Sequence, residues 1–303
     1  MDMPSDGQPT DYLSPSKLSE ALARLSAGGA RPLAGGVEWA RRAGAGRALP
    51  PLVDMGGVEG FSRLFAHPKI GLGIGACVTL RAVGADIWIA KRWAALHEAV
   101  EQIMPPQLHN RATVVGNLCA ADPCHDLPVA LAAHRASLTI ASAGAEPREV
   151  LIPDFYPAPG ATALRPDELV TAVTAPRPSP DAGSAFRKIG AGSDKVQAAA
   201  YVALDTARDR IVEAVIAVGG TAGPIRLTGV ETSLQDQPDA PASYAEAGRQ
   251  AIAFLDAMGS APVDGLRRQW TQVLVRDALE QAASRARSRH DPFEDHAALM
   301  EEG

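Results

Sequence analysis

The sequence predicts a two-domain protein in which helices and mostly short strands are mixed. Its 303 residues exceed the ~250 residues at which a single hydrophobic core usually stops growing. Apolar stretches with helical spacing and short apolar stretches typical of strands occur in both halves. Four of the nine residues of segment 175–183 are Pro or Gly, which is typical of an interdomain linker. We therefore expect a first domain over 1–177, a linker over 178–183, a second domain over 184–288 and a flexible tail over 289–303.

Elements of the first domain follow one another at short intervals. A helix with Leu18, Ala21, Leu22 and Leu25 on one face is expected after Ser14-Pro15-Ser16, and Gly28-Gly29 ends it. After it we expect strands at 31–34, 52–55 and 70–79, a helix at 91–103, a loop at 112–128, a helix at 127–134, and strands near 136–141 and 148–152.

The second domain is predicted to pair strands with two long helices. Segments 198–204 and 211–218 have the apolar, β-branched character of strands and are joined by a polar turn at 205–210. Segments 244–258 and 266–286 have the apolar spacing of amphipathic helices.

Composition and charge narrow the classes of function. Apolar residues make up 46% of the chain and charged residues 21%, as in soluble globular proteins. The net charge is −6 and the basic residues form no patch, which argues against a nucleic-acid-binding protein. No apolar run has the length of a spanning helix, and the N-terminal stretch lacks the apolar core of a secretory signal. Because the three cysteines also lack the spacing of a disulfide framework, we expect a cytoplasmic protein.

Two glycine-containing loops are candidates for holding phosphate. Gly35-Gly36 lies between a predicted strand and a helical turn, where backbone N–H groups can form a small anion-binding concavity. The alternative is an ordinary tight turn. Thr113, Gly116 and Asn117 place a hydroxyl, a glycine and a carboxamide within five residues of an apolar loop.

Two other patterns are weaker. The segment Gly71–Ala76 formally fits a G-x-G-x-x-A dinucleotide fingerprint, but the residues after it favour a strand and turn, and no acidic residue ends a second strand. Cys119, Cys124 and His125 lack the second close pair of a structural zinc site, so buried, inert cysteines are the preferred interpretation.

Eight motifs in order resemble the FAD-binding medium subunit of the molybdenum hydroxylases, the xanthine dehydrogenase and carbon monoxide dehydrogenase group. They are LAGGVEW (33–39), LVDMGG (52–57), IGACVTL (74–80), NRATVVGNLC (110–119), DLP (126–128), LRPDEL (164–169), FRK (186–188) and GPIRLTGVE (223–231). The resemblance covers the chain from Leu18 to about Ala286.

The resemblance implies a fold, a cofactor and partners. The fold would be a two-subdomain FAD-binding domain of the vanillyl-alcohol-oxidase/CO-dehydrogenase type, followed by an α+β domain like the C-terminal domain of CO-dehydrogenase flavoproteins. The partners would be a large molybdopterin-binding subunit and a small subunit with two [2Fe–2S] clusters, in a dimer of heterotrimers. Electrons would pass from those clusters through FAD to an external acceptor, so the chain would be an oxidoreductase subunit.

The resemblance also implies the cofactor-binding residues. Leu33, Ala34, Gly35, Gly36, Val37 and Glu38 would form the first phosphate loop. Thr113, Gly116 and Asn117 would form the second. Asp126, Ile103 and Val170 would line the flavin pocket, and the positive charge of Lys188 would stabilise an anionic reduced flavin.

The sequence departs from the family pattern at three positions, where Val37, Val115 and Gly192 replace Thr or Ser, Gly, and Arg. These departures motivate an alternative, a flavin-free structural subunit that bridges the molybdenum and iron–sulfur subunits. A third hypothesis is a stand-alone flavin oxidase or reductase, but the second domain offers few acid or base residues for it.

Overall fold

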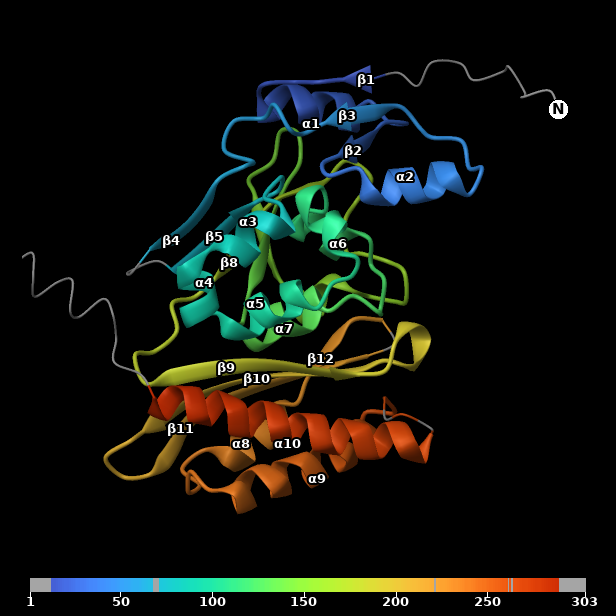
Figure 1. Cartoon of the computed structure of the whole chain (residues 1–303). Coiled ribbons are helices and arrows are strands. Elements are labelled where there is room, and N and C mark those ends of the chain that lie inside the picture. The colour runs from blue at the N-terminus through green and yellow to red at the C-terminus, as the bar shows by residue number, and fades with distance from the viewer. Residues whose placement is uncertain (1–11, 68–70, 221, 261, 263, 289–303) are drawn as a thin grey trace, which may run out of the picture.

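The computed structural model describes residues 12–67, 71–220, 222–260, 262 and 264–288. In this part of the chain the strands form three sheets, of three, five and four strands. Figure 1 shows the three-stranded sheet at the top, the five-stranded sheet in the middle and the four-stranded sheet below them. The first two sheets contain only residues before 176 and the third only residues after 181. Because helices accompany three separate sheets, two of which are antiparallel, the expected α+β fold is confirmed.

The three-stranded sheet carries the first candidate loop. Its strands are parallel and lie in the order β1-β3-β2. Its elements are β1 (Tyr12–Leu13), α1 (Leu18–Ser26), β2 (Arg31–Leu33), α2 (Val37–Gly44) and β3 (Leu52–Asp54). The predicted helix after Ser16 and the strands at 31–34 and 52–55 are thus confirmed. The residue before α1 is Lys17, so the serines at 14 and 16 do not cap it.

The five-stranded sheet is antiparallel, in the order β4-β5-β8-β6-β7. Its strands are β4 (Leu64–His67), β5 (Gly71–Gly75), β6 (Ser137–Ala141), β7 (Arg148–Leu151) and β8 (Leu169–Ala175). The helices of this region are α3 (Leu80–Ala85), α4 (Ile87–Arg92), α5 (Ala94–Glu101), α6 (Val114–Cys119) and α7 (Leu127–Ala133), with 3-10 helices η1 (Pro106–Asn110) and η2 (Ile152–Phe155). Since Gly71–Gly75 forms an antiparallel strand, it is no dinucleotide-binding turn.

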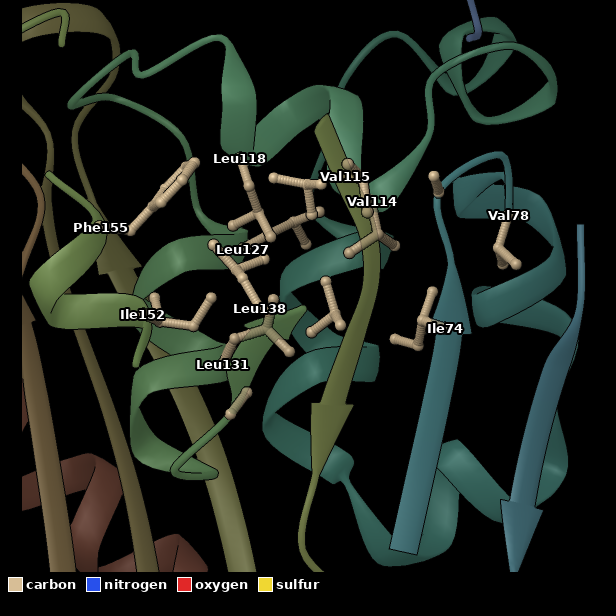
Figure 2. Packing of buried hydrophobic residues seen from close by; sticks show 14 of the residues in the cluster. Ile74, Val78, Val114, Val115, Leu118, Leu127, Leu131, Leu138, Ile152 and Phe155 are labelled. Atoms are coloured by element: carbon tan, nitrogen blue, oxygen red, sulfur yellow. The ribbon is translucent and has the colours of Figure 1, made fainter. Parts of the chain in front are cut away.

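The helices pack on this sheet through one continuous apolar core. Figure 2 shows Val115 and Leu118 of α6 beside Leu127 of α7, and Leu138 of β6 beside Leu131 of α7. All five side chains are buried. Burial of this many aliphatic side chains is the main free-energy gain that fixes α6 and α7, and with them the candidate site.

The C-terminal part is a four-stranded sheet covered on both faces. The strand order is β12-β11-β10-β9, with all neighbours antiparallel. Helices α8, α9 and α10 cover one face, and α5 and α7 lie against the other (Figure 1). The elements are β9 (Ala182–Ile189), η3 (Gly192–Asp194), β10 (Val196–Asp205), β11 (Arg210–Gly219), β12 (Pro224–Arg226), α8 (Thr228–Leu234), α9 (Pro241–Ala257) and α10 (Gly265–Arg287). The predicted strands at 198–204 and 211–218 and both long helices are confirmed.

The segment between the two parts is held by buried side chains. Arg92 donates a hydrogen bond from Nη2 to the carbonyl of Pro178 at 3.0 Å, and Trp93 donates from Nε1 to the carbonyl of Pro176 at 3.3 Å. Tyr201 of β10 accepts a hydrogen bond from the Ser179 N–H at 3.1 Å. Strand β9 begins at Ala182, so the last two residues of the predicted linker already belong to the sheet.

Two predicted elements of the N-terminal part were wrong. The single helix at 91–103 is two helices, because the backbone at Trp93 (φ −120°, ψ 50°) leaves the helical conformation between α4 and α5. The loop at 112–128 contains helix α6, which Thr113 caps. Its six residues are too few to show helical periodicity. The predicted flexible tail at 289–303 lies outside the described residues.

No helix within the described ranges is both long enough and apolar enough to cross a membrane.

Candidate functional site

The first predicted loop is the turn between β2 and α2. Gly36, the residue before α2, has φ +77°, a left-handed conformation that favours glycine. The Ala40 N–H makes the first hydrogen bond of the helix, to the Gly36 carbonyl at 2.9 Å. The N–H groups of Val37, Glu38 and Trp39 precede that bond and are the donors that a helix start offers to an anion.

The second loop lies directly against the first. A Cβ atom built on Gly35 would fall 1.7 Å from the Arg111 carbonyl oxygen and 3.3 Å from the Ala112 Cα. Arg111 also donates a hydrogen bond from Nε to the Gly35 carbonyl at 3.3 Å. The absence of a side chain at Gly35 is thus what lets these two backbone segments, 76 residues apart in sequence, come into contact.

Thr113, Gly116 and Asn117 lie at the start of helix α6. The Thr113 hydroxyl accepts a hydrogen bond from the Gly116 N–H at 3.0 Å and so caps the helix. The Oδ1 atom of Asn117 is buried and has no hydrogen-bond partner among the described residues. Such an atom is uncommon in folded proteins. It is the acceptor that this loop offers to the hydroxyl or amide of a ligand.

The two valine departures do not disturb these loops. Val37 is the first residue of α2, where it contributes a backbone N–H whatever its side chain. Val115 has the helical backbone of α6 and its side chain is 6% exposed, packed in the core. The position therefore needs no glycine, and its side chain points into the hydrophobic core (Figure 2).

Charges beside the first loop have mixed signs. The Arg111 guanidinium reaches to 4.0 Å from the position of a Cβ on Gly36 and brings a positive charge to the turn. Glu38 forms ion pairs of 2.8 Å with Arg41 and with Arg42 of the same helix. The hydrogen bond from Arg41 lowers the pKa of Glu38 to about 2, although partial burial opposes it. Because the Glu38 carboxylate is held by these arginines, what Glu38 can offer an anion is its backbone N–H.

Asp126 and Lys188, predicted on different sides of the domain boundary, meet in a buried cluster. Lys188 Nζ lies 2.7 Å from Asp126 Oδ2 and donates a further bond to the Gln102 carbonyl at 2.9 Å. Lys195 Nζ lies 2.8 Å from Asp126 Oδ1, and Gln197 Nε2 donates to the same oxygen at 2.5 Å. The Asp126 side chain is 4% exposed, so its charge is balanced by lysines in place of water.

The third departure, Gly192, lies beside this cluster. It begins η3 with φ +55°, and its carbonyl accepts a hydrogen bond from the Cys124 thiol at 3.2 Å.

Burial raises the pKa of Cys119 to about 12 and that of Cys77 to about 11, so both thiols are poor nucleophiles at neutral pH.

Two predicted residues lie in the hydrophobic packing. Ile103 is partly buried against the core, and its carbonyl lies 2.9 Å from the ring Nε2 of His109. Val170 lies in β8 opposite Ile140 and is 1% exposed. Their expected contact with a flavin ring stays a prediction.

Sequence reasoning missed Arg111, Lys195 and Gln197 as site residues. Arg111 stands inside the second motif, and its charge two residues before Thr113 was the available signal. Gln197 is the one polar residue in the apolar run Val196–Leu204 apart from the Tyr201 hydroxyl, and such a residue marks a position where a strand meets a polar partner.

A surface pocket of about 350 Å³ opens beside the second loop. It is lined by Arg81, Pro106, Gln107, His109 and Asn110, none of which is a predicted site residue.

Comparison with protein families gives a match over more than half of the chain. Residues 8–178 match the family described as the FAD binding domain in molybdopterin dehydrogenase. The medium subunit of nicotine 6-hydroxylase from Paenarthrobacter nicotinovorans is 30% identical over 289 residues, covering 90% of this chain and 97% of that subunit. The carbon monoxide dehydrogenase medium chain of Afipia carboxidovorans is 30% identical over 294 residues, covering 92% and 98%.

Solved structures agree with this fold. A Cu,Mo-CO dehydrogenase in a cyanide-inactivated form matches with a TM-score of 0.80 and 25% identity, over 91% of this chain and 98% of that one. Quinoline 2-oxidoreductase from Pseudomonas putida 86 matches with a TM-score of 0.79 and 24% identity, over 92% and 98%, which shows a shared fold.

These matches confirm the expected resemblance, the FAD cofactor and the oxidoreductase class. Residues 33–38 and 113–117 both lie within the matched range, and their two loops meet at Gly35 and Arg111. The chain belongs to the FAD-binding medium subunits of the molybdenum hydroxylase family.

Proposed function

We propose that this chain is the electron-transfer subunit of a heterotrimeric molybdenum hydroxylase, in which its FAD receives electrons from the [2Fe–2S] clusters of a small subunit and passes them to an external acceptor. The partners would be that small subunit and a large molybdopterin-binding subunit, in a dimer of heterotrimers. Medium subunits of nicotine 6-hydroxylase and carbon monoxide dehydrogenase, which this chain resembles over nearly their whole lengths, support the proposal. We further propose 1–177 as the FAD-binding domain and, because β9 already begins at Ala182, 178–181 as the linker and 182–288 as the second domain.

The contact between Gly35 and Arg111 is the observation that carries this proposal. It brings the start of α2 next to the segment that leads into α6, so one ligand bound at the first loop would also lie close to the second. One diphosphate bridge is of the size to receive donors from two such neighbouring turns. The unpartnered Asn117 Oδ1 adds an acceptor in the second loop.

The residues of this chain fit FAD, and each has a defined task. Residues 33–38 would bind phosphate through backbone N–H groups, with the Arg111 guanidinium as counter-charge. Thr113 would fix the start of α6, and Asn117 would accept a hydrogen bond from a ligand hydroxyl. Lys188 would place a positive charge at the flavin, with Asp126 fixing its position, and Ile103 and Val170 would supply apolar walls. When bound, FAD supplies the reversible uptake of electrons.

Spectroscopy of the full chain tests the proposal. We expect the purified 303-residue protein to be yellow, or to quench the fluorescence of added FAD with one binding site per chain. A matched measurement with riboflavin, which lacks the diphosphate, should show binding at least ~10-fold weaker if the loops act on phosphate. A colourless chain that also takes up no added FAD would contradict the proposal and leave the flavin-free bridging subunit as the better hypothesis.

A further inference from the structure

Three side chains of the C-terminal part, two from its sheet and one from the residue just before β10, converge on one carboxylate of the N-terminal part. Lys188 of β9 and Gln197 of β10 are directly opposite each other in the antiparallel ladder. Lys195 precedes Gln197 by two residues, and the two share a face because side chains alternate along an extended chain. All three donate to Asp126, at the start of α7.

The two lysines bind different oxygen atoms of the Asp126 carboxylate. Lys188 takes one carboxylate oxygen of Asp126, and Lys195 with Gln197 takes the other. An ammonium group has three N–H donors. Lys188 donates one hydrogen bond to Asp126 and one to the Gln102 carbonyl. Among the described residues, this leaves its third N–H donor for a ligand.

Lys195 and Gln197 also hold the chain between α6 and α7. Lys195 donates to the Cys124 carbonyl, and Gln197 donates to the His125 carbonyl at 3.1 Å. The ring Nδ1 of His125 lies 2.8 Å from the carbonyl of Asn117. A continuous chain of contacts thus runs from Lys195 to the helix that carries the second loop.

The charges of the cluster do not cancel. Two lysines face one carboxylate, which leaves one surplus positive charge. The side chains of Lys188 and Lys195 are only 20% and 11% exposed, so water screens this charge less than it would at the surface.

We propose that Lys195 is a positioning residue for the flavin: it shares the Asp126 carboxylate with Lys188, so that Lys188 keeps a free donor and the cluster keeps a positive charge for the negatively charged reduced flavin. This inference rests on the proposed function. It assigns Lys195 a role through Asp126 and Lys188 and not through contact with the cofactor.

The test is the affinity of the full chain for oxidised and for reduced FAD in wild type and in Lys195→Met. Because the variant removes the surplus charge, the preference for reduced over oxidised FAD should fall about tenfold, which lowers the two-electron midpoint potential by about 30 mV. Lys195→Arg keeps the charge and should restore the wild-type ratio. Asp126→Asn raises the net charge and should move the ratio in the opposite direction.

Lys17→Met is the matched control, since Lys17 is exposed beside α1 and its loss changes the net charge equally. It should leave the ratio unchanged. Should Lys195→Met not accumulate as folded protein, Lys195→Gln keeps a donor for the Cys124 carbonyl and has the same predicted shift.

Three results would overturn the inference: an unchanged ratio in Lys195→Met and Lys195→Gln, an equal loss of affinity for both redox forms, or a shift of the same sign in Asp126→Asn. If the wild-type chain binds neither form of FAD, the proposed function fails together with the inference. If it binds FAD and one of the three results is found, the inference alone fails.

Discussion

The two halves of the candidate site differ in the groups that form them: backbone groups in the phosphate loops and side chains in the Asp126 cluster. The phosphate loops are made of backbone groups, and Val37 and Val115 occupy them without altering the turn of the chain. The Asp126 cluster is made of side chains from both parts of the molecule, and Lys188, Lys195 and Gln197 each lie within hydrogen-bond distance of Asp126. The difference teaches that departures from a family motif must be weighed by what each position contributes. A side chain matters little where the backbone binds, and matters greatly where it is one of few buried charges.

Gly35→Ala should have the largest effect, because the new Cβ would fall 1.7 Å from the Arg111 carbonyl oxygen and force the loops apart. We expect FAD affinity to fall at least ~100-fold, or about 3 kcal/mol. Titration of FAD fluorescence measures it. Gly44→Ala, at the end of the same helix with nothing within 4 Å of its Cβ, is the control and should bind as wild type. Equal affinities in the two variants would show that loop contact does not govern binding.

Asp126→Ala should destabilise the protein by about 3 kcal/mol, because it leaves two mostly buried lysines without their carboxylate. Urea unfolding followed by circular dichroism measures the change. Asp181→Ala removes an exposed carboxylate before β9 and should change stability by less than ~0.5 kcal/mol. A loss of stability below about 1 kcal/mol in Asp126→Ala would contradict the claim that the two lysines depend on this carboxylate for their charge balance.

Val115→Gly restores the glycine of the family pattern and separates backbone from side-chain effects. The variant loses a buried side chain and places glycine inside α6, so we expect a loss of about 2 kcal/mol in stability. The affinity of the folded variant for FAD should stay within about twofold of wild type, because the valine side chain contributes no hydrogen-bond donor. A clear gain in affinity would show that the valine obstructs the ligand.

The Arg148–Glu168 ion pair lies outside the Asp126 cluster and should make a pH-dependent contribution to stability through its side chains. Bonds of 2.8 Å from Arg148 lower the pKa of Glu168 to about 2, helped by the Arg165 N–H and opposed by burial. The folded pKa is below the unfolded value, so this stabilisation is present above pH ~4.5 and is lost as the pH falls toward 2. Glu168→Gln should lose about 2 kcal/mol at pH 7 and less at pH 3. The exposed Glu246→Gln, measured in the same unfolding series, should show a much smaller change; a Glu168→Gln loss that does not shrink at pH 3 would contradict this account.

Much of the fold was readable from the sequence because its elements have long apolar patterns. Helices α9 and α10 and strands β10 and β11 were predicted nearly at their true bounds. Helix α6 was missed because six residues span fewer than two turns, and its cap at Thr113 was interpreted as a ligand donor. The break at Trp93 was missed because the apolar spacing continues through it while the backbone does not.

For the site, the loops were readable and their surroundings were not. Gly35-Gly36 and Gly116-Asn117 are local patterns, so sequence could point to them. That Gly35 touches Arg111, or that Lys195 and Gln197 share a face with Lys188, depends on sheet register and on packing between distant segments. Single-sequence patterns do not contain that information.

Amide hydrogen exchange of the full chain with and without FAD tests the convergence of the two loops most directly. FAD should slow exchange in peptides covering 33–39 and 113–118 at the same ligand concentration, since one molecule binds both. Slowing in only one of these stretches, or in neither while FAD is bound, would contradict it.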